Sequence, residues 1–343
     1  MGQSGSGLAG SRGEQARSSK YQGLFSESEL GEIQVTYQSI CRQGSSSSGN
    51  KTDTEKGFSL SQLQDFLRGK LPDAIVARLY AELQARGGAQ GGAKQPVGVS
   101  SHAFVVTMET LLKGTLEEQG RLLFVLVADE GAEAMSVGQV SKLIDSMLTA
   151  YEEGLKSSNR MNNWQLASTP EANQKFVDFV IQSFGKGSQT PESAAAVSRE
   201  DFVRWLQQTP LVQQVFADVF HQCFTQGTCP AAAAGANTDT SVLHHMPSLP
   251  ACQDVDWRKV SSQLDVPTLL VLNQSLPHHL RDQWRFLYSS ALHGASFATL
   301  LSHITRRGPS VLLVRDTKGQ LFGGFAADSW EIGPSFTGSS RCL

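Results

Sequence analysis

Apolar residues recur at helical spacing through most of residues 23–226 of this chain. Two clear helical stretches are 122–127 and 211–224, and Cys223 is expected in the core of the second one. Helix starts carry a repeated signal, in which an apolar residue precedes a capping serine. It occurs at Phe25-Ser26, Phe58-Ser59, Met135-Ser136 and Val197-Ser198. The pattern predicts an all-α region over residues 23–226.

This helix-start signal resembles the exit half of an EF-hand, and residues 122–127 before Asp129 resemble an entering helix. A calcium loop of about 12 residues needs alternating oxygen ligands, a glycine at the turn and a final bidentate glutamate. Residues 129–139 are one residue short, lack that glycine and end with Gln139. We therefore expect EF-hand-like helix pairs without metal, and calcium sensing is the alternative that the ligand set disfavours. Such a domain keeps a helical groove for a partner or for its own chain.

Three stretches rich in glycine, serine or alanine interrupt the helical pattern, at 44–57, 87–98 and 227–241. They bury too little apolar surface to offset the entropy of ordering, so we expect them to be mobile. The last stretch is predicted to be a linker between the helical region and a C-terminal region at 242–343.

The apolar pattern changes in this C-terminal region. Residues 280–293 have apolar side chains at helical spacing and predict an amphipathic helix that ends at Gly294. A second helical face begins at Phe297 and is stopped by Gly308 and the proline after it. The run 311–325 then predicts a β-hairpin, because two apolar segments flank a turn.

In this order, the residues of the C-terminal region resemble the opening of a TLDc domain. The resemblance implies an α+β protein, with the all-α EF-hand-like domain followed by an incomplete TLDc domain of two helices and a hairpin. Because a TLDc domain continues beyond such a hairpin, we interpret the chain as a shortened form of a longer protein. The motif residues to which the resemblance assigns a structural or interaction role are Trp284, Tyr288, His293, Gly294, Ser296, Phe297, Gly323, Gly324, Phe325 and Trp330.

The N-terminus begins MGQSGS, which fits the acceptor pattern for N-myristoylation. Gly2 would carry the acyl chain, at the start of a disordered leader over residues 1–22. A glycine- and serine-rich leader without acylation is the alternative. TLDc proteins that associate with mTOR at lysosomes also begin with a myristoylated glycine, and this resemblance favours acylation. A single acyl chain would hold the protein on membranes reversibly.

Composition and motifs disfavour several other classes of protein. The 29 Lys and Arg residues against 32 Asp and Glu residues give a net charge of -3, without the basic field that nucleic-acid binding needs. The five cysteines have no metal-site or disulfide-framework spacing and suit a reducing compartment. His293 suits capping or packing, and no phosphate-binding loop, dinucleotide fingerprint or nucleophile motif is present. We predict no enzyme activity, small-molecule substrate, metal or cofactor.

Two functions follow from the TLDc resemblance. The first is a non-catalytic adaptor, cytoplasmic and peripheral on lysosomal membranes. Its implied partners are mTOR complex components and the peripheral sector of the vacuolar-type proton-pumping ATPase. The second is oxidative-stress resistance through the handling of peroxide, which would need a reactive cysteine with a lowered pKa. Cys342, which follows Arg341, is the candidate for that role.

Overall fold

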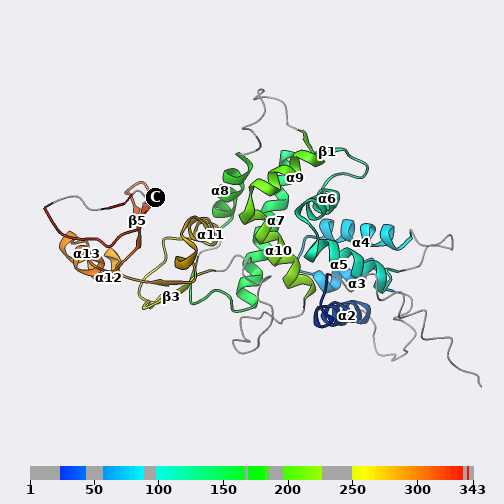
Figure 1. Cartoon of the computed structure of the whole chain (residues 1–343), viewed down its shortest axis with the longest axis horizontal. Coiled ribbons are helices and arrows are strands. Elements are labelled where there is room, and N and C mark those ends of the chain that lie inside the picture. The colour runs from blue at the N-terminus through cyan, green and yellow to red at the C-terminus, as the bar shows by residue number, and fades with distance from the viewer. Residues whose placement is uncertain are drawn as a thin grey trace, which may run out of the picture. The chain divides into compact units, whose positions relative to one another are not determined.

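The computed structural model describes residues 24–43, 57–88, 98–166, 169–182, 184, 196–225, 249–334 and 338–339 (Figure 1). The chain divides into two compact units, which we call the helical unit and the C-terminal unit. The helical unit comprises Met1–Gly154 and Val177–Pro247, and the C-terminal unit comprises Leu155–Phe176 and Ser248–Leu343. The predicted helical region at 23–226 therefore differs from the helical unit, because residues 155–176 pack with the C-terminal unit. The three predicted linkers lie almost wholly outside the described residues, although the second begins inside a helix.

Nine helices within the described residues form or enter the helical unit (Figure 1). They begin where the sequence places capping side chains. At α2, the Ser26 side chain accepts from the Glu29 backbone N–H, while the Glu29 carboxylate accepts from Ser26 N at 2.8 Å. Ser59 and Gln62 form the same capping box at α3. The helices are α2 Glu27–Arg42, α3 Leu60–Leu67, α4 Asp73–Gly88, α5 Ser101–Lys113, α6 Leu116–Val127, α7 Val137–Ser157, α8 Pro170–Ile181, α9 Arg199–Gln208 and α10 Pro210–Phe224.

The core of the helical unit contains a cluster of aromatic rings from separate segments. Phe104 on α5 lies 5.7 Å from Tyr37, 5.8 Å from Phe58 and 6.0 Å from Phe224, measured between ring centroids. The Tyr37 hydroxyl donates to the Val99 carbonyl at 3.0 Å, so its polar end is satisfied inside the core. Apolar burial of this density is the main source of the unit's stability.

Short extended segments join the helices in pairs. Strand β1 (Ala134–Ser136) is antiparallel to β2 (Ala196–Ser198), with Met135 opposite Val197. A second antiparallel bridge joins Phe58 to Val99, and Val99 N donates to the Phe58 carbonyl at 3.0 Å. Each of these four apolar residues is buried and precedes a serine. The residues that carry the repeated apolar–serine signal therefore form two antiparallel pairings, each between two helix–loop–helix segments.

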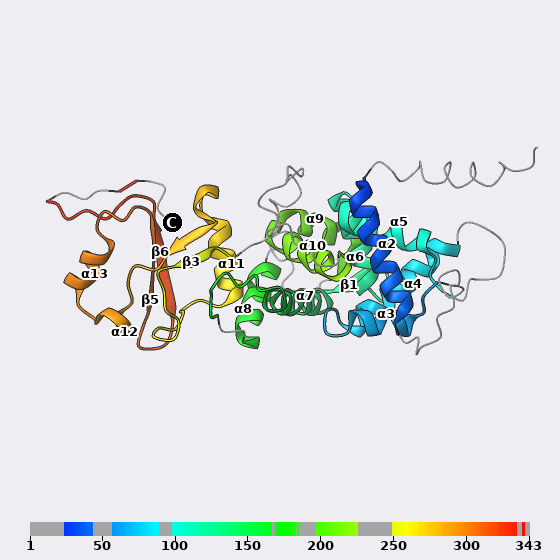
Figure 2. The same ribbon diagram turned by 90° about the horizontal axis from the view of Figure 1, so that it is seen from below.

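The C-terminal unit contains two further two-stranded sheets within the described residues. Strands β3 and β4 are parallel, whereas β5 and β6 form an antiparallel hairpin. In Figure 2 the two strands of this hairpin lie side by side, with α12 and α13 to their left. The elements are β3 Ala251–Gln253, α11 Val266–Ser275, the 3-10 helix η4 His278–Leu280, β4 Gln283–Arg285, α12 Ser290–His293, α13 Phe297–Ile304, β5 Ser310–Arg315 and β6 Leu321–Ala326.

The helix predicted over 280–293 is wrong for residues 281–289. Residues 283–285 form β4, and only α12 at the end of the predicted range is helical. The reason is a distant partner, because β4 pairs with residues 251–253 and Phe286 N donates to the Gln253 carbonyl at 3.0 Å. Residues 283–285 therefore form a strand despite the helical spacing of their apolar neighbours, because the pairing strand is not visible in the local sequence. The predicted end at Gly294 is confirmed, since this glycine has φ 84° after α12.

The second helix and the hairpin are confirmed. Helix α13 begins at Phe297, and the strands pair from Ser310 with Ala326 to Arg315 with Leu321. Asp316 stabilises the turn, because its carboxylate accepts from Lys318 N and Gln320 N at 2.9 and 2.7 Å. Among the helices of the described residues, we find no candidate for a membrane span.

Candidate functional site

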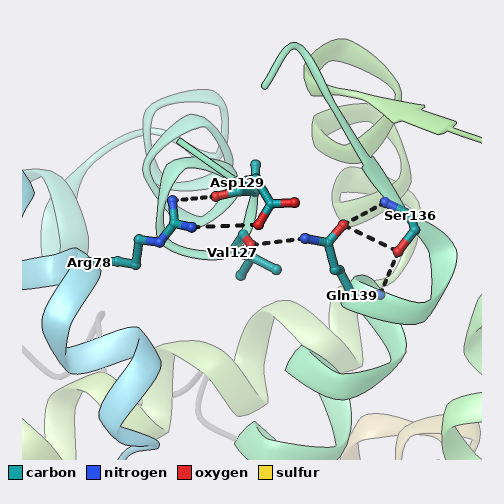
Figure 3. Close-up of polar contacts among 6 residues, drawn as sticks. Arg78, Val127, Asp129, Ser136 and Gln139 are labelled. Carbon is teal, nitrogen blue, oxygen red and sulfur yellow. Dashed lines mark hydrogen bonds and ion pairs between the residues drawn. The ribbon is translucent and has the colours of Figure 1, made fainter. Parts of the chain in front are cut away.

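The segment between α6 and α7 is the best candidate for a metal loop, and its own side chains hold it together (Figure 3). Gln139 stands where a calcium loop would end in glutamate. Its side-chain oxygen accepts from Ser136 N at 2.8 Å, and its amide nitrogen donates to the Val127 carbonyl at 3.5 Å. Gln139 N donates in turn to the Ser136 hydroxyl at 3.2 Å. Gln139 therefore caps α7 and contacts the end of α6.

A positive charge from another helix also reaches this loop. Arg78 on α4 donates to the Ala128 carbonyl at 2.6 Å and lies 3.7 Å from the Asp129 carboxylate (Figure 3). Ala128 is the C-cap of α6, where unpaired carbonyls and the helix dipole favour a cation. The Arg78 guanidinium thus places a positive charge at the start of this loop.

The loop also turns differently from a calcium loop. Gly131 has φ 74°, and Ala132 N donates to the Asp129 carbonyl at 2.9 Å, which closes a tight turn directly after α6. In the paired segment, the side chain of Asp201 is used by the cap at Ser198 and by an ion pair with Arg204 at 2.8 Å. Within the described part of the chain, no group of three His, Cys, Asp or Glu side chains is placed to hold a metal ion.

Sequence reasoning missed two parts of this arrangement. Val99-Ser100 carries the same apolar–serine signal as the four predicted helix starts, and Ser100 caps α5 by accepting from Ala103 N. That signal was present in the sequence. Nothing in the sequence marks Arg78, because a half-buried arginine on a helix has no distinctive sequence signal.

The TLDc motif begins with an aromatic cluster. The Trp284 ring lies 6.0 Å from Trp164, which lies 5.2 Å from Trp257. Trp164 is buried in a loop between α7 and α8, and its indole nitrogen donates to the Pro250 carbonyl at 2.7 Å. The Cys252 N–H donates to the Asn162 carbonyl in the same loop at 3.3 Å. Trp164, which the sequence analysis did not single out, anchors this loop within the C-terminal unit.

The central motif residues form a corner between α12 and α13. The Tyr288 hydroxyl donates to the Gly294 carbonyl, and Ser289 N donates to His293 Nδ1 at 3.2 Å. Ser296 then caps α13 by accepting from Thr299 N. These contacts agree with a capping and packing role for His293.

The last motif residues hold the hairpin. A side chain at Gly323 would meet the Leu312 carbonyl at 2.1 Å, so the close approach of the two strands requires glycine there. Phe325 is buried, while Gly324 faces Leu312 across the hairpin. The Trp330 indole nitrogen donates to the Ser310 hydroxyl at 2.8 Å and fixes the segment after β6. Gly323, Phe325 and Trp330 therefore contribute to the local fold of the hairpin.

Several large apolar side chains in and near the motif are exposed. Phe297 is 72% exposed, Phe322 is 58% exposed and Ile332 is 75% exposed. Within the described residues after Leu276, Ile304 and Phe325 are the buried members of the apolar core. This part of the C-terminal unit consequently presents apolar surface that suits a protein interaction.

The described cysteines are poor candidates for redox chemistry. Cys41, Cys223 and Cys252 are free and buried. Desolvation raises the pKa of the Cys223 thiol to about 12 and that of Cys252 to about 11. A reactive thiol needs a lowered pKa, which favours the thiolate. Gly2 and Cys342, the other predicted positions, lie outside the described residues.

Comparisons with known proteins match the C-terminal region to a known domain and most of the chain to curated relatives. The TLDc domain model matches residues 259–343. The human MTOR-associated protein MEAK7 is 30% identical over 330 residues, which cover 93% of this chain and 68% of the relative. The Xenopus laevis MTOR-associated protein MEAK7 is 28% identical over 322 residues, covering 92% of this chain and 67% of the relative. The chain thus spans about two thirds of the length of these relatives.

A shorter match involves another function. Oxidation resistance protein 1 of Podospora anserina is 40% identical over 66 residues, which are 18% of this chain and 19% of that protein. The match is therefore local, whereas the matches to the MTOR-associated relatives include the helical segments as well as the TLDc region.

Proposed function

The chain belongs to the family of MTOR-associated protein MEAK7, which contains a TLDc domain, and we propose that it is a non-catalytic adaptor in mTOR signalling. The observation that carries this proposal is the match over 93% of the chain to a relative named for its association with mTOR. The exposed side chains of Phe297 and Phe322 support it, since they offer an apolar surface on the TLDc part. The proposed partners are mTOR complex components and the peripheral sector of the vacuolar-type ATPase.

Within this proposal, the helical unit is an EF-hand-like assembly that does not respond to calcium. The antiparallel pairings at Met135–Val197 and Phe58–Val99 support that interpretation, because each joins two helix–loop–helix segments. Arg78 and Gln139 hold the ends of this loop without a cation, through hydrogen bonds to the Ala128 and Val127 carbonyls. Gln139 has a neutral amide in the place of the final glutamate and cannot supply the charged bidentate contact that calcium needs.

Calorimetry on the full chain tests the absence of a calcium response. We expect no saturable heat on addition of millimolar calcium to the wild type. Arg78→Ala should loosen the loop and speed exchange of amides 128–132 by a factor corresponding to about 1–2 kcal/mol. Arg68→Ala, which removes an exposed ion pair with Asp65, is the matched control and should leave that loop unchanged. Low-micromolar calcium binding by the wild type would overturn this part of the proposal.

The adaptor would bind lysosomal membranes through an acyl chain on Gly2. Intact-mass measurement after coexpression with the N-myristoyltransferase should show the acyl mass, and Gly2→Ala should remove it. In cells, the same substitution should move the protein from membranes to cytosol, because it removes the acyl chain that is the proposed membrane anchor. A wild-type mass without the acyl increment would refute acylation and leave the adaptor proposal standing.

Affinity purification from cells tests the adaptor function directly. The bait is the full chain, beside the double variant Phe297→Asp and Phe322→Asp, with Phe179→Asp as the matched control. Phe179 is 60% exposed on α8, so all three substitutions add charge at exposed apolar positions. We expect the wild type and the control to recover mTOR complex components and ATPase subunits, and the double variant to lose them. Equal recovery by all three would remove the TLDc surface from the proposal.

Oxidative-stress resistance is the second candidate, supported by the local match to Oxidation resistance protein 1. The raised pKa values of Cys223 and Cys252 argue against peroxide reduction by those thiols. A peroxide-consumption assay on the purified chain separates the candidates, with Cys342→Ser as the variant. Turnover by the wild type that this substitution abolishes would favour the second candidate over the adaptor.

A further inference from the structure

Two histidines of the C-terminal unit stack at the corner between α12 and α13. The ring centroids of His293 and His303 are 4.3 Å apart, and the ring planes are inclined by 21°. The Tyr288 ring lies 5.5 Å from His293 and 5.9 Å from His303. Both imidazoles are half-buried, and Phe286 is a further ring beside His293. The stack therefore joins the last residue of α12 to the last turn of α13.

A backbone hydrogen bond determines the protonation state of one imidazole. Ser289 N donates to His293 Nδ1 at 3.2 Å, so this nitrogen carries a lone pair and no proton. In the closed corner His293 is therefore neutral, with its proton on Nε2. A proton added at Nδ1 would remove the acceptor and would leave the Ser289 N–H without this partner.

The second imidazole limits how much positive charge the corner can hold. With both rings protonated, two unit charges would face each other across the 4.3 Å of the stack and repel. Charged side chains follow α13 or flank the residue that pairs with Thr305, namely Arg306, Arg307, Asp328 and Glu331. Within the described part of the chain, neither imidazole forms an ion pair with a carboxylate. Two adjacent imidazolium charges would thus have no paired carboxylate.

The chain between the two helices can move when the stack opens. Gly294 lies between α12 and α13 at φ 84°, and the space around its Cα is open. A further contact that closes the corner is the hydrogen bond from the Tyr288 hydroxyl to the Gly294 carbonyl. Phe297, which is 72% exposed, is the first residue of α13 and belongs to the apolar surface of the proposed adaptor. A movement of α13 would therefore move that surface.

We propose that the stack of His293 and His303 is a proton-sensitive joint. It holds α13 against α12 while both imidazoles are neutral, and it opens when they take up protons. The open corner binds more protons than the closed corner, so it is favoured as pH falls below the ordinary titration range of histidine, near pH 6.5. Opening moves Phe297 and weakens partner binding in acid, and only this last consequence rests on the proposed adaptor function.

Hydrogen exchange on the full chain between about pH 7.5 and 5 tests the joint, with rates corrected for the intrinsic pH dependence of exchange. Each proton taken up on opening changes the opening equilibrium by about tenfold per pH unit. We expect the protection of amides 289–294 to fall by up to about a hundredfold per unit below about pH 6, since two protons enter. Amides 266–275 of α11, in the same unit, are the internal reference and should keep their protection.

Two substitutions remove the titrating groups one at a time. His303→Phe keeps a ring in the stack, and His293→Asn keeps an acceptor for the Ser289 N–H. Each should reduce the slope to about tenfold per pH unit or less, and the double variant should abolish it. His278→Gln, at an exposed histidine on η4, is the matched control and should keep the wild-type slope. Protection of α11 at neutral pH shows that each variant is folded.

A wild-type corner with the same protection at both ends of the pH range would overturn the proposal, whatever the variants do. A folded double variant that keeps the wild-type slope would overturn it as well, because other groups would then take up the protons. Recovery of mTOR complex components at neutral pH tests the adaptor function separately, since the joint is closed there. Failure of the joint and failure of the proposed function are thus distinguishable.

Discussion

The helical unit and residues 277–334 use the same local signals but differ in how much apolar surface they bury. Both regions contain serine-capped helices and turns fixed by side chains. The helical unit adds a core in which Phe58, Phe104 and Phe202 are fully buried, whereas residues 277–334 leave Phe297 and Phe322 exposed. Caps and turns determine where elements begin and end, while burial supplies most of the stability. We therefore expect amides 311–325 to exchange faster than those of α6 and α10.

The largest effect should come from removing a ring at the centre of the helical core. Phe104→Ala is expected to cost about 3–5 kcal/mol, because Phe104 contacts three other rings and the cavity cannot refill fully. Native-state hydrogen exchange of peptides from α5 and α10 measures the loss. Phe179→Ala, at an exposed position in the same unit, is the control and should change stability by about 0.5 kcal/mol or less. A similar cost for both substitutions would contradict the comparison.

The next effect tests whether the C-terminal unit depends on the loop between α7 and α8. Trp164→Ala should cost about 3 kcal/mol in the segment around β3 and α11, through loss of its ring contacts and the bond to Pro250. Trp164→Phe keeps an aromatic ring but loses that hydrogen bond, so its cost should be nearer about 1 kcal/mol. Exchange of amides 249–276 is the measurement. If Trp164→Ala left them unchanged, residues 155–176 would not belong with this unit energetically.

Acidification should weaken the helical unit by a smaller amount. Desolvation, with the nearby Lys113 charge, lowers the pKa of His221 on α10 to about 4, although Glu29 opposes the shift. The unfolded chain, with an ordinary pKa near 6.5, therefore binds the proton first as pH falls. The contribution of neutral His221 to the free energy of unfolding is therefore complete above about pH 6.5. It should decline by about 2 kcal/mol between pH 7.5 and 5. His221→Gln should reduce this decline in denaturant titrations of α10 protection, and an unchanged decline would assign it to other groups.

The smallest effect should come from the exposed hairpin. Phe322→Ala removes a side chain that is 58% exposed and should change the exchange of amides 311–325 by about 0.5 kcal/mol or less. Phe325→Ala, on the same strand but buried, is the matched comparison and should cost about 2 kcal/mol or more. A large cost for Phe322→Ala would mean that its ring is covered in solution, by another part of the chain or by a second copy.

Several features of the fold were predictable because they depend on residues close together in sequence. The caps at Ser26 and Ser59, helix α13 and the hairpin at 310–326 all follow from local signals. The helix predicted over 280–293 failed because its competitor, the strand at 251–253, lies some thirty residues away. The spacing of apolar residues in 280–293 carries no information about the pairing of β4 with β3, so it could not predict the strand.

The candidate sites divide in the same way. The sequence itself determined that the loop after α6 lacks the final glutamate of a calcium site, since ligand identity is a local property. Only the tertiary structure decided that Arg78 supplies the charge at that loop and that Trp164 anchors the C-terminal unit. Both contacts join segments that are far apart in the chain. Their energies depend on distance and burial, which exist only once the chain has folded.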